Sequence, residues 1–156
     1  MKELIEYREK LLARFEEAAK EFCDVCQSFD DPFANIGGEE TPHRLAFLVR
    51  GVDREAYGLR VRRTLNEDDP GFTNFDPQAW MTEHYDRDEP LENILNEFSE
   101  SIHEMCKLLA KGPQPIWSRL SHHDVLGKEL TLQLWAERNL AHIEGHLAAL
   151  KRAENK

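Results

Sequence analysis

Four stretches of the sequence repeat apolar residues every three or four positions, and this spacing constrains the fold more than any other feature. The period matches one face of an α-helix, and Glu, Lys and Arg fill many of the remaining positions. The stretches cover residues 2–28, 42–65, 89–112 and 131–156. Because each helix must bury its apolar face and no strand pattern stands out, we expect an all-α four-helix bundle. The length of 156 residues predicts one domain over residues 1–156.

Helix caps and breakers mark the ends of these stretches. Two aspartates and a proline at residues 30–32 stop the first helix. Thr41 offers a hydroxyl N-cap, and Pro42 follows it in the first turn of the second helix. Thr131 is the expected N-cap of the fourth helix.

The connections are long for a simple bundle. Residues 66–88 carry several aromatic side chains, which we expect to pin this segment to the bundle. Within it, Asp76 and Pro77 predict a short helical turn around Trp80. Residues 113–129 read as an irregular loop.

The charge balance excludes two classes of partner. A formal net charge of −10 argues against nucleic acids and anionic membrane surfaces, which both need a basic footprint. The one basic cluster alternates with acidic residues, so we interpret it as a solvated helix face. Its members are Arg54, Arg60, Arg62 and Arg63.

Composition also bears on the compartment. No apolar run is long enough to span a bilayer, and the first residues have no apolar signal core, so we expect a cytoplasmic protein. Three cysteines fit reduced thiols. Cys23 and Cys26 have redox-motif spacing, but they fall near the C-terminal end of a helix, where the dipole does not lower a thiol pKa. We interpret them as small core residues.

His142 and His146 are the candidate functional pair of the last helix. Residues four apart lie one turn above each other on one face, so two imidazoles can bind one metal ion. The alternative is two partly buried structural histidines. The spacing alone does not choose between these interpretations.

Taken in order, several short segments resemble the DinB-like (DinB/YfiT-like) family of four-helix proteins. The last of them contains the paired histidines, and together they extend over nearly the whole chain. The segments are residues 41–42, 52–57, 62–70, 75–80, 123–132 and 142–148.

The resemblance implies a homodimer and a divalent metal, zinc or nickel, held by three histidines. His142 and His146 match the two ligands of the last helix, and the third ligand position falls on Leu48. Leucine cannot bind a metal, and His43 is a substitute only if the bundle shifts or the helix register differs locally. The carboxylates of Asp53 and Glu144 are further candidates.

Two functions follow from these residues. One is a metal-dependent enzyme, a thiol transferase or hydrolase with a degraded histidine site, in which His43 or a carboxylate completes the ligands. The other is a metal-free, non-catalytic dimer that binds a small molecule or a protein partner. In that case His142 and His146 hydrogen-bond to each other or to Asn139. No catalytic residue beyond the metal ligands is identified.

Overall fold

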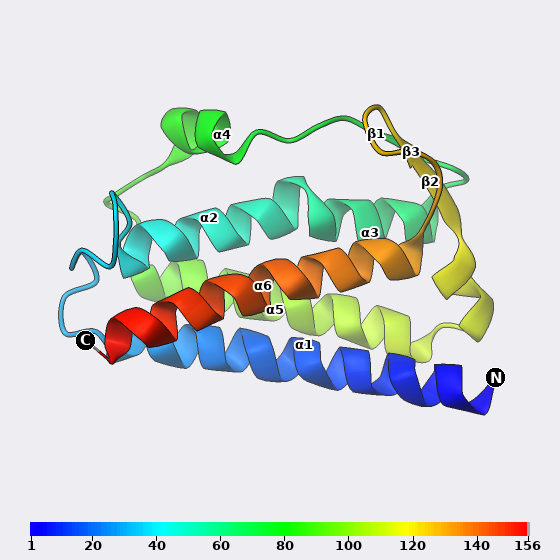
Figure 1. The fold of residues 1–156 in the computed structure, drawn as a ribbon, viewed down its shortest axis with the longest axis horizontal. Coiled ribbons are helices and arrows are strands. Elements are labelled where there is room, and N and C mark those ends of the chain that lie inside the picture. Colours follow the sequence, from blue (N-terminus) through cyan, green and yellow to red (C-terminus); the bar gives the residue numbers. More distant parts are fainter. Residues whose placement is uncertain (156) are drawn as a thin grey trace.

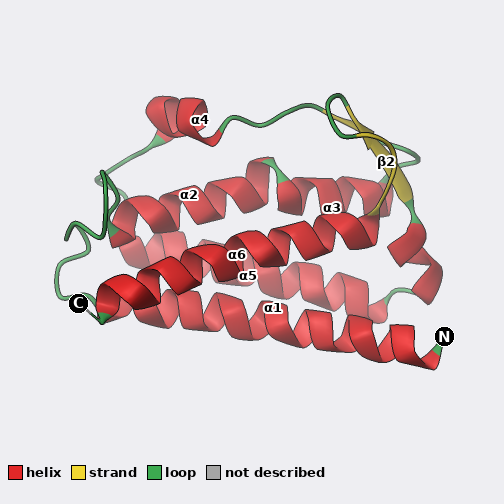
Figure 2. Ribbon diagram, in the orientation of Figure 1, coloured by secondary structure: helices red, strands yellow, loops and turns green. Residues whose placement is uncertain are grey.

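The computed structural model describes residues 1–155, and most of them are helical (Figures 1 and 2). The helices are α1 (Lys2–Ser28), α2 (Pro42–Glu55), α3 (Tyr57–Asn66), α4 (Pro77–His84), α5 (Leu91–Lys111) and α6 (Leu132–Glu154). A 3-10 turn, η1 (Gln114–Ser118), and the strands β1 (Gly71–Phe72), β2 (Leu120–His123) and β3 (Gly127–Thr131) complete the elements. Within residues 1–155, no helix is both long and apolar enough to cross a membrane.

The four-helix bundle expected from the sequence is confirmed. In Figure 1, α2 and α3 follow each other as one rod, and α1, α5 and α6 supply the other three. Helix α1 packs against α5 and α6, while α2 packs against α5 and α3 against α6. The centre is filled by side chains that are almost fully buried, among them Phe15, Phe22, Phe98, Ile102 and Trp135.

The second helix is not continuous, which corrects the expectation of one helix over residues 42–65. It breaks at Ala56, whose backbone angles (φ −131°, ψ −95°) are not helical. The carboxylate of Asp53, one turn earlier, is buried at the break. A Cβ at Gly58 would lie 2.1 Å from Oδ1 of Asp53, so the close approach requires glycine there. No apolar period reports such a local break.

The predicted helix starts are confirmed by side-chain caps. Oγ1 of Thr41 accepts a hydrogen bond from the Arg44 N–H (3.1 Å), and Oγ1 of Thr131 accepts one from Leu134 (3.1 Å). Asp76 caps α4 by accepting from two backbone N–H groups. Helix α4 lies outside the bundle beside α2. The Trp80 ring of α4 packs directly against Gly51 of α2, since a Cβ at Gly51 would lie only 2.3 Å from that ring.

The segment expected to be an irregular loop, residues 113–129, contains β2 and the first part of β3, and β1 lies in the connection of residues 66–88. Strand β1 pairs with β2 in parallel, and β2 pairs with β3 in antiparallel fashion. The inward residues of β2 are the polar Ser121 and His123, while Leu120 and His122 face outward. A strand is usually recognised by inward apolar and outward polar residues. Strand β2 has only four residues and its inward residues are polar, so the sequence pattern does not indicate it.

Candidate functional site

His142 and His146 are brought together by their spacing on α6. Their Nε2 atoms lie 3.1 Å apart, and their rings meet edge to face with centroids 4.5 Å apart. Both rings are partly buried. The two nitrogens therefore converge on one point, as the sequence predicts.

Burial favours the neutral form of both rings. It lowers the pKa of His142 to about 4, and the neighbouring His146 lowers that pKa further. Burial also lowers the pKa of His146. Neutral imidazole is the form that binds metal ions. In the absence of an ion, one Nε2–H donates to the other Nε2, while Nδ1 of His142 is buried without a hydrogen-bond partner.

The pair fits two ligands of a metal site. Two nitrogens on one tetrahedral zinc ion, each about 2.0–2.1 Å from it, lie about 3.3 Å apart. The observed 3.1 Å is close to this value. Within residues 1–155, however, no group of three or more His, Cys, Asp and Glu side chains is placed to hold an ion. A metal ion at this pair would therefore have at most these two histidines as ligands from the described residues, whereas catalytic zinc sites commonly have three protein ligands.

His43 is not brought to the pair. Its ring is 1% exposed and both ring nitrogens are occupied. Nε2 donates to the carbonyl of Glu89 (2.6 Å), and Nδ1 therefore accepts from the hydroxyl of Tyr85 (2.7 Å). His43 instead fixes the residues that lead into α5.

The other candidate ligands also have partners elsewhere. Asp53 accepts hydrogen bonds from Ser101 (2.6 Å) and from Asn139 (3.3 Å), so Asn139 serves the helix break and not the histidine pair. Glu144 pairs with Arg14 at 2.6 Å. Leu48, at the position matched to the third ligand, is a buried apolar side chain.

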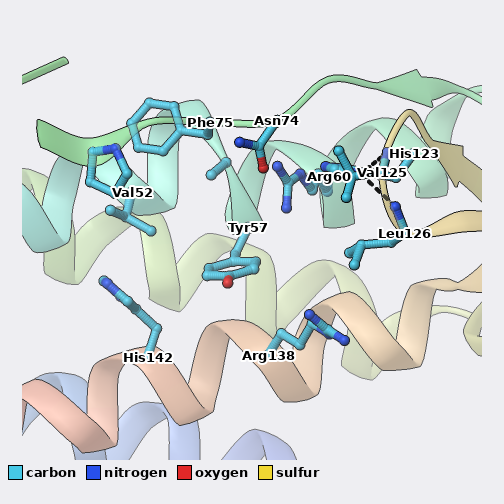
Figure 3. A pocket seen from close by; sticks show the side chains of 12 residues that line it. Val52, Tyr57, Arg60, Asn74, Phe75, His123, Val125, Leu126, Arg138 and His142 are labelled. Atoms are coloured by element: carbon cyan, nitrogen blue, oxygen red, sulfur yellow. Dashed lines mark hydrogen bonds between the residues drawn. The ribbon is translucent and has the colours of Figure 1, made fainter. Parts of the chain in front are cut away.

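A pocket of about 230 Å³ opens beside His142 (Figure 3). It lies between the α2–α3 break, the segment before α4, the β2–β3 turn and α6. The short sheet positions the turn over the pocket. Its lining comprises Val52, Ala56, Tyr57, Arg60, Asn74, Phe75, Pro77, His123, Val125, Leu126, Arg138 and His142.

Arg60 departs from the solvated face expected for the basic cluster. Its side chain is only 6% exposed, and its guanidinium lies 4.7 Å from the ring centroid of Trp135. Arg63 does pair with Glu67 on the surface. Arg60 was missed because alternating charges are typical of an exposed helix, while the aromatic partner lies far along the chain.

Burial disfavours the reactive thiolate form of all three cysteines. Burial raises the pKa of Cys23 to about 11 and that of Cys106 to about 12, and it also raises the pKa of Cys26. All three cysteines are free. Cys26 and Cys106 lie in the core, and Cys23 is partly buried against it, in keeping with the expectation of small core residues at Cys23 and Cys26.

The bundle has the DinB/YfiT-like four-helix fold. A solved structure described as "YfiT from Bacillus subtilis is a probable metal-dependent hydrolase with an unusual four-helix bundle topology" matches with a TM-score of 0.84. The match has 18% sequence identity and covers 96% of this chain and 87% of that chain. No family model matches the sequence, and no curated protein does.

Proposed function

We propose that the chain is a metal-dependent hydrolase that acts on a small molecule in the pocket beside His142. The observation that carries the proposal is the 3.1 Å approach of the Nε2 atoms of His142 and His146. The fold shared with YfiT, a probable metal-dependent hydrolase, supports it. Thiol transfer stays a prediction.

The residues of the chain have separate parts in such a reaction. His142 and His146 would hold a divalent ion, and water or substrate would fill its remaining positions. The ion, when bound, supplies a Lewis acid that polarises a substrate bond or lowers the pKa of water. Apolar side chains such as Val52 and Phe75 exclude bulk water and orient the substrate. In hydrolysis the water oxygen joins the electrophilic atom, and a water proton leaves with the departing group.

A metal ion that binds only the folded chain should raise its melting temperature, so we expect added zinc, nickel or manganese to do so for the wild type. Because the site has two protein ligands, its affinity should be weaker than that of a site with three histidines. His146→Ala should abolish this rise. His103→Ala, at a mostly exposed histidine of α5, is the matched control and should keep it.

A second function is favoured because His142 and His146 can satisfy each other by a hydrogen bond without a metal. Each Nε2 already has the other as its partner, and Leu48 stands at the third position. On this reading the chain is a metal-free binding protein. Melting temperatures that ignore metal in both the wild type and His146→Ala would support it and overturn the hydrolase.

A further inference from the structure

Two arginines line the pocket without an acidic partner. Within the part of the chain that the structure describes, neither Arg60 nor Arg138 forms an ion pair, although the protein as a whole carries a net charge of −10. Burial lowers the pKa of Arg60; the nearby Arg138 lowers it further, while Tyr57 and Asp124 act in the opposite direction. Arg60 is buried, so its charge is costly without an anion nearby, whereas Arg138 is exposed to solvent at the edge of the pocket.

Arg60 is fixed in place but not saturated. One terminal nitrogen donates to the carbonyl of Thr73 (3.3 Å), and the guanidinium lies between the rings of Trp135 (4.7 Å) and Tyr57 (5.4 Å). Among the described residues, no other acceptor receives a hydrogen bond from this guanidinium. Its remaining N–H groups are available to a ligand.

His123 adds a neutral donor to the same lining. Its Nδ1 accepts from the backbone N–H groups of Val125 (3.0 Å) and Leu126 (3.1 Å), so the proton of the neutral ring is on Nε2 (Figure 3). Burial lowers the pKa of His123 and favours this neutral form. The nearest carboxylate, that of Asp124, is half exposed and lies on the Nδ1 side.

The opposite part of the pocket combines apolar side chains with the ring of His142. In Figure 3, Val52, Phe75 and His142 lie away from Arg60 and His123. Arg138 lies one helical turn before His142 on the same face of α6. The cavity therefore suits a small molecule with an anionic end and an apolar body.

We propose that the pocket binds a small organic carboxylate, with its anionic group between Arg60 and Arg138 and its apolar part against Val52 and Phe75. A guanidinium pairs with a carboxylate through parallel, charge-assisted hydrogen bonds. The inference rests on the proposed function in one respect, since it gives the substrate class for a reaction at His142. The acidic protein disfavours ligands with several negative charges, which sets carboxylates ahead of phosphates.

Calorimetric titration tests this assignment. The probes are phenylacetate, hexanoate, the neutral amides of both, and inorganic phosphate. The protein is first treated with a chelator and desalted, so that the result does not depend on a metal. We expect at least one carboxylate to bind about tenfold more tightly than its amide.

Two variants on α6 locate the binding. Arg138→Gln should weaken carboxylate binding about tenfold, because it removes one charge-assisted contact. Arg152→Gln makes the same charge change at an exposed position of α6 and should leave the affinity within about twofold.

Three results would overturn the proposal: no carboxylate bound at millimolar concentration, equal affinity for acid and amide, or tighter binding of phosphate. Unchanged carboxylate affinity in Arg138→Gln would also overturn it. If the protein binds a carboxylate but takes up no metal, the carboxylate proposal stands and the hydrolase proposal fails. If it takes up metal but binds no carboxylate, the hydrolase proposal stands and the carboxylate proposal fails.

Discussion

At the residue scale, Asp53 and Gly58 approach each other closely at the break between α2 and α3. A Cβ at Gly58 would meet the side chain of Asp53 at 2.1 Å and its backbone oxygen at 2.4 Å. Gly58→Ala should therefore lower the free energy of unfolding by about 1–3 kcal/mol, measured by urea denaturation. Gly145→Ala, where no atom lies within 4 Å, should raise it by up to about 1 kcal/mol. Equal stability of Gly58→Ala and wild type would contradict the packing at the break.

The depressed pKa of His142 predicts a loss of stability in mild acid. The pKa is about 4 in the folded chain and 6.5 ordinarily, because burial and then His146 disfavour the charged ring. As the pH falls from 6.5 to 4, the unfolded chain takes up a proton that the folded chain does not, so the free energy of unfolding falls. The difference is up to about 3 kcal/mol.

His142→Gln should remove most of this pH dependence, as followed by urea unfolding at several pH values across the window. The contribution of His142 to the free energy of unfolding is fully present above pH 6.5, its ordinary pKa, and is lost as the pH falls towards its folded-state pKa of about 4. A variant that loses stability as steeply as the wild type would show that His142 is not protected from protonation.

Leu48→His tests the third ligand position that the resemblance implies. A third imidazole at the pair should tighten zinc binding by tenfold or more, roughly the difference between incomplete and complete ligand sets. Zinc titration followed by melting temperature measures it. Leu45→His, at another buried leucine of α2, controls for the cost of a buried histidine. Equal zinc responses of the two variants would show that residue 48 is not the third ligand position of the site.

Residue spacing predicts the histidine pair but not its surroundings. His142 and His146 meet because both lie on one helix, whereas the partners of His43 are Tyr85 and Glu89, which come from another segment. Arg60 meets Trp135 across the bundle. Contacts between distant segments depend on tertiary packing, which a helical period does not report.

At the scale of elements, the four helical stretches and the capped helix starts could be predicted, whereas the break between α2 and α3 and the sheet could not. Apolar periods and the caps Thr41, Asp76 and Thr131 act locally, so they can be read from the chain. Strand β1 has two residues, and β2 buries polar side chains. These strands pair because the connection after α3, which contains β1, lies beside the connection after α5, which contains β2 and β3. The alternation of their own residues does not predict them.

The cap of α4 holds one wall of the pocket. Asp76 accepts hydrogen bonds from Gln78 (3.1 Å) and Ala79 (3.2 Å), and the adjacent Phe75 and Pro77 line the cavity. Asp76→Ala should cost about 1 kcal/mol and increase amide hydrogen exchange in α4. Asp76→Asn keeps a capping oxygen and should exchange almost as slowly as the wild type. Similar rapid exchange in both variants would mean that the cap does not hold α4.

At the scale of the whole molecule, the bundle was predictable because four amphipathic stretches have few ways to bury their apolar faces together. We propose that residues 1–156 form one domain, since the buried apolar side chains make one cluster drawn from all four rods. The homodimer and the cytoplasmic location stay predictions. Size-exclusion chromatography with light scattering tests the homodimer.

The proposed hydrolase requires that His142 and His146 hold a divalent ion. Elemental analysis of the purified, untagged protein measures this, beside a variant that carries both His142→Ala and His146→Ala. At dialysis equilibrium with an excess of zinc, the wild-type chain should hold about one ion per chain more than the double variant. Equal metal contents in the two proteins, or no metal in either, would contradict the claim.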